Sequence, residues 1–290
     1  MTAKEQLPEP SNPLGIDGIE FIEYATSQPQ AFGALLQKMG FAAVARHRSR
    51  EVMLYRQGTM NLIVNAHESA MRSATSSLTS APAIAAIALR VRDAGHAFRH
   101  SVDLGAWEMP TRAAAMELHI PGIHGVGDSL IYFVDRYRDF AIYDVDFVFD
   151  RNIKPDPPAV AGLHYFGVVQ SIMGERARDW LDFYQNLFGF SVLPRGQYFG
   201  VLPKGTLLES PCHKFYLQLI EPPPGAEEIR WDEGLVRVGL GAPDIPAAVR
   251  ELKKRGVVFV DHGAVQPSDK GALTQVYLDG VTFELVVSHL

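Results

Sequence analysis

The amino-acid sequence predicts an α+β fold made of four β-α-β-β-β units arranged in two pairs. The clearest unit occupies residues 161–190, where a strand-like run is followed by an amphipathic helical pattern, Gly189 and a second strand. Gly189 stands where the residue past a helix end often needs a positive φ. Weaker copies of this unit recur along the chain, and the length of 290 residues suits two domains of ordinary size.

Composition limits the class of protein. Apolar residues make up 47% of the chain and charged residues 21%, as in a globular protein with a full core. The net charge of -6 argues against a nucleic-acid partner, because phosphate binding requires a basic surface. Cys212 is the single cysteine, which excludes an internal disulfide and favours a reducing compartment. With neither a signal-peptide pattern nor a membrane-length apolar run, we expect a cytoplasmic protein without a membrane partner.

The first two units form an N-terminal domain, expected at residues 15–145. Its helices are expected at residues 28–39 and from the capping residue Asp93 to about residue 102. Residues 144–160 contain three prolines and are the expected linker. The expected strands of this domain are residues 17–24, 52–55, 60–65, 84–91, 117–120 and 129–134.

The last two units form a C-terminal domain, expected at residues 160–290. Its first helix ends before Gly189, and its second covers residues 244–254. Asp279 and Gly280 predict a hairpin turn. The expected strands are residues 164–170, 200–203, 214–220, 235–240, 274–278 and 282–287.

Several short motifs, in their order along the chain, resemble the 4-hydroxyphenylpyruvate dioxygenase family of the vicinal-oxygen-chelate superfamily. The motifs are GIDGIEFIE, FYQNLFGF, IEPP, LTQVYLD and TFELVV, and the resemblance covers roughly residues 15–288. It implies that each pair of units curls into a half-open barrel, the glyoxalase or extradiol dioxygenase fold. The chain also resembles the dioxygenase-like module of some 3-dehydroshikimate dehydratases. It lacks their catalytic barrel domain, so dehydratase activity is not implied.

The resemblance implies a metal position in the C-terminal domain. The family binds non-haem iron through two histidines and a glutamate, which leaves positions open for an oxo acid and oxygen. His164 matches the first ligand and Glu284 the last. Arg237 stands where the family has its second histidine, and a protonated guanidinium has no lone pair for a metal. The corresponding N-terminal positions, where no metal site is expected, hold Gly18, Ala86 and Ile131.

Two functions remain open at this point. In the first, a dioxygenase-like enzyme holds a divalent metal, Fe(II), through His164 and Glu284 and acts on a 2-oxo acid or a catechol-like small molecule. Arg237 then anchors an anionic group of the substrate, and Gln275, which matches a substrate-contacting glutamine of the family, orients it. In the second, a metal-free binding or regulatory protein pairs Arg237 with Glu284. Only the first function requires bound metal.

Other features bear on the first function. His213 and Gln218 are candidates to supply the missing metal ligand. Ile220 stands where the family usually has a substrate-contacting asparagine. The chain ends at Leu290, so we expect it to lack the helix that closes the family's site. The family is often oligomeric, which makes a homo-oligomer the expected assembly, although the sequence shows no interface pattern.

Overall fold

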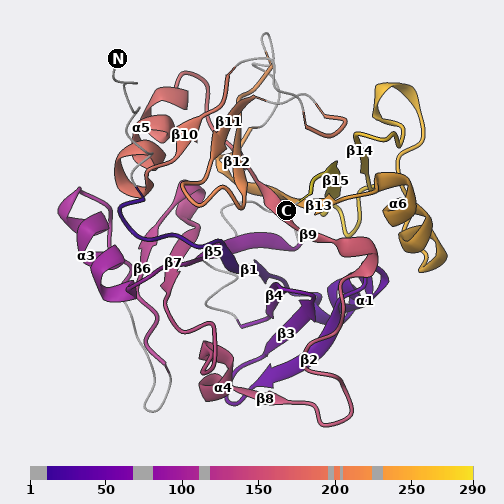
Figure 1. Ribbon diagram of the computed structural model, residues 1–290, viewed down its shortest axis with the longest axis horizontal. Helices are drawn as coiled ribbons and strands as arrows, with labels where there is room; N and C mark the ends of the chain where they lie inside the picture. Colours follow the sequence, from indigo (N-terminus) through magenta and orange to yellow (C-terminus); the bar gives the residue numbers. More distant parts are fainter. Residues whose placement is uncertain are drawn as a thin grey trace, which may run out of the picture.

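The chain folds as a mixed α+β protein around an open sheet of many strands (Figure 1). The computed structural model describes residues 12–67, 81–110, 118–194, 199–202, 205–223 and 231–289. Within these residues the sheet runs in the order β10-β11-β12-β9-β13-β5-β1-β4-β3-β2-β8, with β14, β15, β6 and β7 attached beside this path. No helix among the described residues has the length and apolar character needed to cross a membrane.

The first half of the chain forms strands β1 to β8, called the N-terminal sheet below. The strands are β1 (Ile19–Ala25), β2 (Ala42–His47), β3 (Val52–Gln57), β4 (Met60–Asn65), β5 (Ala83–Arg90), β6 (Gly122–His124), β7 (Leu130–Val134) and β8 (Phe147–Phe149). The helices are α1 (Pro29–Lys38), α3 (Ala94–Asp103) and α4 (Ile142–Asp146), with a 3-10 turn at Val126–Asp128.

The second half forms strands β9 to β15, called the C-terminal sheet below. The strands are β9 (His164–Ser171), β10 (Ser191–Val192), β11 (Thr206–Glu209), β12 (Tyr216–Ile220), β13 (Gly234–Ala242), β14 (Gly271–Leu273) and β15 (Phe283–Val287). The helices are α5 (Ala177–Phe188) and α6 (Ile245–Lys254), with 3-10 turns at Val160–Gly162 and Gly263–Val265. The two sheets join where Leu235 of β13 pairs with Ile84 of β5.

Local signals place the helices where the sequence predicts them. The Asp93 carboxylate accepts a hydrogen bond from the His96 amide at 2.7 Å and caps α3. Asp244 caps α6 in the same way, through the Ala247 amide at 2.8 Å. Gly189 ends α5 with φ at 77°, the left-handed conformation expected from the sequence.

Three predicted strands are wrong in position. Residues 118–120 are not a strand, whereas β6 begins at Gly122; Glu117 lies outside the described residues. Residues 200–202 are irregular, and the strand lies at β11 instead. The strand expected at residues 274–278 lies earlier in the chain, as β14. Leu273 of β14 pairs with Glu284 of β15. The pairing partner decides each position, and local alternation does not reveal that partner.

The expected linker at 144–160 is partly regular structure. Its start belongs to α4, and its next residues form β8, which pairs with β2 and so extends the N-terminal sheet. Gln57 of β3 is fully buried and holds the far end of this segment, because its side-chain oxygen accepts a hydrogen bond from the Val160 amide at 2.8 Å.

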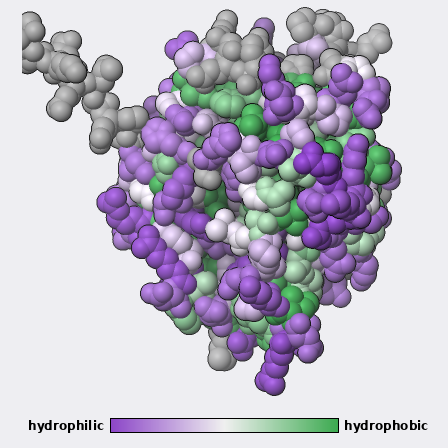
Figure 2. Space-filling view, turned by 45° about the vertical axis from the view of Figure 1, so that its right-hand side comes forward, coloured by the Kyte–Doolittle hydropathy of each residue, from purple (hydrophilic) through white to green (hydrophobic). Residues whose placement is uncertain are grey.

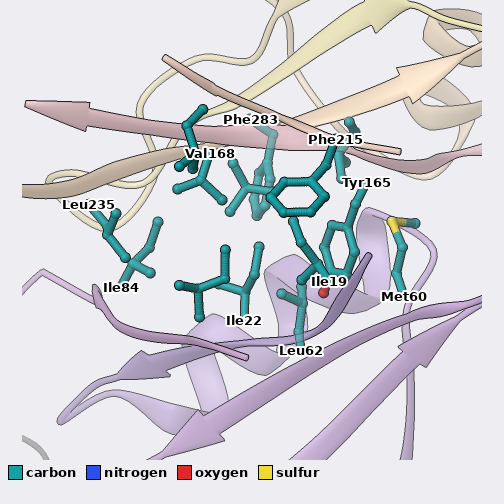
Figure 3. Close-up of a cluster of buried hydrophobic side chains, with 14 of the residues drawn as sticks. Ile19, Ile22, Met60, Leu62, Ile84, Tyr165, Val168, Phe215, Leu235 and Phe283 are labelled. Carbon is teal, nitrogen blue, oxygen red and sulfur yellow. The ribbon is translucent and has the colours of Figure 1, made fainter. Parts of the chain in front are cut away.

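A continuous apolar core joins the two sheets. Figure 3 shows Ile19, Ile22 and Leu62 of the N-terminal sheet facing Val168 and Phe283 of the C-terminal sheet. All five side chains are almost completely buried, so each sheet uses one face for this shared core. The remaining faces of both sheets are therefore available for other contacts.

The opposite face of the N-terminal sheet carries a second, smaller apolar cluster around Phe21, Leu54 and Tyr143. The outer surface of the molecule differs from both clusters: in Figure 2, hydrophilic side chains cover most of the visible face, and hydrophobic ones are scattered between them. This distribution is ordinary for a protein surface in contact with water.

Candidate functional site

Three of the predicted site residues, His164, Arg237 and Glu284, lie along one face of the C-terminal sheet. Every second residue of a strand faces the same side of the sheet. On β13 one such set is Arg237, Gly239 and Gly241. Glu284 of β15 is in register with Gly239. His164, at the start of β9, is in register with Gly241 on the other side of β13. The two glycines leave the middle strand without side chains between these polar groups.

Arg237 and Glu284 form an ion pair on this face. The Arg237 Nε atom lies 3.6 Å from Glu284 Oε2, and the side chains are 15% and 2% exposed. The Arg237 Nε atom is buried and has no hydrogen-bond partner within the described residues. Burial lowers the pKa of Arg237 from its ordinary value, and the charge of Glu284 opposes this shift. The pair is therefore an electrostatic contact rather than a bidentate hydrogen-bonded fork.

His164 contacts other groups. Its Nδ1 atom lies 3.0 Å from the Gly162 carbonyl oxygen, which can only accept, so Nδ1 carries the proton. In the neutral ring, Nε2 then accepts from the Ser288 hydroxyl, also at 3.0 Å. A Cβ atom at Gly241 would lie 2.2 Å from Nε2, so the ring occupies space that only glycine leaves open. No described contact joins His164 to Arg237 or Glu284.

Strand register explains this separation. His164 is level with Gly241, Glu284 is level with Gly239, and Arg237 lies two residues further along β13. The three predicted positions are thus staggered along the strand. Within the part of the chain that the structure describes, no three His, Cys, Asp or Glu side chains are grouped so that they could hold a metal ion.

Aromatic side chains fill the space beside Glu284. Phe166 stacks on Tyr216, with ring centroids 4.9 Å apart, and Phe199 packs against both rings. Gly200, next to Phe199, approaches so closely that a Cβ atom there would lie 2.3 Å from Glu284 Oε1. The cavity that remains here measures about 10 Å³, room for about one water molecule. The sequence analysis did not single out these aromatic residues, although Phe166 has the parity of His164 on β9.

The other predicted site residues lie in three different environments. Gln275 is exposed just beyond β14, and its backbone amide bonds to the Val258 carbonyl oxygen at 3.0 Å. His213 is 59% exposed and lies 3.1 Å from Glu209. Gln218 is buried and lines the small cavity with Glu284. Ile220 ends β12. Of this group, only Gln218 shares the surroundings of Glu284.

Comparison with known proteins identifies relatives of the chain. Residues 11–148 match the family described as hydroxyphenylpyruvate dioxygenase, N-terminal. Hemolysin VllY of Vibrio vulnificus is 35% identical over 271 residues, covering 86% of this chain and 73% of that protein. The 4-hydroxyphenylpyruvate dioxygenase of Pseudomonas aeruginosa is 32% identical over 272 residues, covering 87% and 73%. A 3-dehydroshikimate dehydratase of the same species is 30% identical over 259 residues, covering 84% and 40%.

A solved structure agrees at the level of the fold. A fusion of a xylose isomerase-like TIM barrel with a 4-hydroxyphenylpyruvate dioxygenase superposes with a TM-score of 0.75 at 24% identity, covering 96% of this chain and 50% of that one. The sequence matches confirm the resemblance drawn from short motifs for both kinds of relative. The chain belongs to the 4-hydroxyphenylpyruvate dioxygenase family.

Proposed function

We propose that this chain is a metal-free member of its family that binds a small molecule and does not catalyse dioxygenation. The ion pair between Arg237 and Glu284 carries this proposal. Arg237, a permanent cation, stands where the resemblance puts the second metal histidine, and it lies beside the carboxylate that would be the last ligand. A metal cation at the same place would be repelled by the guanidinium and would have to displace it from Glu284.

The remaining donors do not fit an iron site. His164 is correctly oriented for a ligand in one respect, since Nδ1 donates to a carbonyl group and Nε2 carries the lone pair. That lone pair accepts from the Ser288 hydroxyl, however, and the register separates His164 from Glu284 along β13. Arg237 cannot complete the set, because a guanidinium has no lone pair to donate. One histidine and one ion-paired carboxylate are a poor substitute for the facial triad.

The space around Glu284 supports the same conclusion. Small-molecule sites commonly enclose about 300–1,000 Å³, whereas the cavity beside Glu284 measures about 10 Å³. An oxo acid or a catechol would have to displace Phe166 or Phe199 from the stacked aromatic group.

A dioxygenase is the second candidate, and the names of the relatives favour it. The Pseudomonas aeruginosa relative is a 4-hydroxyphenylpyruvate dioxygenase at 32% identity. In this alternative, His164 and Glu284 hold Fe(II), Arg237 anchors the substrate carboxylate and Gln275 orients the substrate, an aromatic 2-oxo acid or a catechol-like compound. It requires Arg237 to leave Glu284 and the aromatic side chains to move aside.

Oxygen uptake separates the two candidates. Purified protein supplied with Fe(II), ascorbate and 4-hydroxyphenylpyruvate should consume no more oxygen than the same mixture without protein, because no complete ligand set is available. The Pseudomonas aeruginosa dioxygenase, assayed in parallel, confirms that the mixture supports turnover. Oxygen uptake that depends on substrate and disappears in Glu284→Ala would overturn the proposal and establish the dioxygenase.

A further inference from the structure

A second cavity lies in the other half of the molecule. It measures about 620 Å³, within the range typical of small-molecule sites. Residues of β1, β3, β4, β5 and β8 line it, together with α4 and the segments on either side of this helix. The lining residues that matter below are Arg56, Arg90, Arg138, Tyr137, Tyr143 and Phe149.

A buried polar network fixes two of the arginines in this cavity. Glu20 of β1 is 2% exposed, and its Oε2 atom accepts a hydrogen bond from Arg90 Nε at 2.5 Å. Asn61 of β4 donates to the Glu20 backbone oxygen at 3.0 Å and accepts from Arg56 Nε at 2.8 Å. These contacts hold both guanidinium groups at the cavity wall before any ligand arrives. Preorganised donors of this kind lower the cost of binding.

The cavity offers hydrogen-bond donors that the protein itself does not use. Arg56 donates elsewhere only through Nη1, to Asp156 Oδ1 and the Pro155 oxygen, both at 3.0 Å. Arg90 donates elsewhere only through Nη2, to the Thr59 oxygen at 3.4 Å. Each guanidinium therefore keeps one terminal nitrogen without an acceptor among the described residues. Arg138 has no ion pair within the described residues either, although its guanidinium lies over the Tyr137 ring.

Tyr143 adds a buried hydroxyl to the lining of the cavity. The residue is 1% exposed, and its hydroxyl lies beside the Glu20 carboxylate but forms no well-aligned hydrogen bond within the described residues. Burial, and secondarily the nearby charge of Glu20, raises the pKa of Tyr143 well above its ordinary value. The phenol therefore remains protonated and can donate. A buried polar group without a well-aligned partner is costly, and a ligand oxygen would relieve that cost.

The carboxylates of the lining are already engaged. Glu20 is paired with Arg90, Asp156 with Arg56, and Asp144 accepts from the Ala141 amide at 2.8 Å. The groups that remain for a ligand are donors, so the site selects an acceptor, most strongly an anion.

Aromatic rings supply the walls around these donors. The Arg56 guanidinium lies 5.4 Å from the Tyr143 ring centre and 5.8 Å from that of Phe149. The guanidinium groups of Arg90 and Arg138 lie 5.5 Å and 5.6 Å from the Tyr137 ring centre. Flat guanidinium and ring surfaces favour a flat partner that stacks between them.

We propose that this cavity of the N-terminal sheet is a binding site for an aromatic carboxylate, whose carboxylate accepts from Arg56, Arg90 and Arg138 while its ring lies against Tyr137 and Phe149. The Tyr143 hydroxyl donates to an oxygen of the same ligand. The site is remote from Arg237 and Glu284 and needs no metal. Binding at this cavity can therefore be tested independently of dioxygenase activity. If it is found, it gives the proposed binding function a location and a class of ligand.

Calorimetric titration of the full chain with 4-hydroxybenzoate tests the site, in buffer containing EDTA. We expect saturable binding at one site, weakened about tenfold in Tyr143→Phe and about fivefold in Arg138→Gln. Tyr143→Phe removes a hydroxyl that makes no well-aligned hydrogen bond, and Arg138→Gln removes an exposed side chain. Both variants should therefore fold normally, which thermal melting verifies. The uncharged analogue 4-hydroxybenzamide should bind much more weakly than the carboxylate.

Matched controls make the result specific. Tyr24→Phe makes the same change at a buried tyrosine of β1 outside the cavity, and Arg178→Gln removes an arginine that is 90% exposed on α5. Both should bind 4-hydroxybenzoate as the wild type does. The proposal is overturned if wild type shows no saturable binding, if carboxylate and amide bind equally, or if Tyr143→Phe and Arg138→Gln behave like their controls.

Discussion

Replacing Gly167 with alanine should destabilise the protein by about 3 kcal/mol or more, a large effect for a single methyl group. Gly167 lies in the middle of β9, in register with Tyr216 of the parallel strand β12. A Cβ atom at Gly167 would lie 2.1 Å from the Tyr216 carbonyl oxygen and 2.9 Å from its carbon. These are backbone atoms of a central strand pair, so they cannot move aside without breaking the sheet. Urea denaturation of wild type and Gly167→Ala measures the difference.

Gly239→Ala is the matched control, because Gly239 is the direct partner of Gly167 on β13. A Cβ atom at Gly239 would meet its nearest neighbours at 3.5 Å, an ordinary van der Waals distance. Its substitution should therefore change the free energy of unfolding by less than about 1 kcal/mol. If both variants lose the same stability, the register that brings β9 between β12 and β13 is wrong, and with it the placement of the site.

The second large effect concerns the ion pair between Arg237 and Glu284. Arg237→Leu should cost about 2–3 kcal/mol, because it removes the cation beside a carboxylate that is 1% exposed. Breaking a buried ion pair usually costs about 3–5 kcal/mol. We expect a cost at or below the lower end of that range, since the contact is 3.6 Å long and Arg237 is partly accessible. Thermal and urea denaturation of the variant provide the measurement.

A double-mutant cycle distinguishes the pair from a simple packing loss. Glu284→Gln keeps the size of the side chain and removes its charge, so Arg237→Leu should cost much less in the Glu284→Gln background than in the wild type. An equal cost in both backgrounds would show that Arg237 acts through packing alone. No cost in the wild type would show that the two charges are not paired in solution.

The sequence predicted the helices well because their signals are local. Asp93 and Asp244 cap the first turns, and Gly189 adopts the left-handed conformation that ends α5. Strands depend on distant partners, and here prediction was weaker. Residues 274–278 alternate like a strand, but Gln275 and Val276 are exposed, and the pairing that fixes this edge lies earlier, at Gly271–Leu273.

The candidate site was only partly predictable, for the same reason. The contact between Arg237 and Glu284 could be expected from their positions in the family. The separation of His164 could not, since it follows from the register of β9 against β13, which shifts between Gly239 and Leu240.

The N-terminal cavity was missed altogether, although the sequence contains a signal. Three mainly apolar strands each carry a polar side chain in or at the end of the strand, namely Glu20, Asn61 and Arg90. A buried charge in such a run requires a partner. Which strands bring the partners together is decided by tertiary structure, so these residues could not be assembled into a site from the sequence.

The most direct test of the central claim, that Arg237 has replaced the metal site, is anaerobic calorimetric titration of purified protein with Fe(II), on wild type, Glu284→Ala and Arg237→His. We predict no stoichiometric iron binding that depends on Glu284 in the wild type. Arg237→His should gain affinity for Fe(II), because it removes the opposing cation and supplies a lone pair. Stoichiometric binding in the wild type that is lost in Glu284→Ala would contradict this claim and favour the iron-dependent dioxygenase instead.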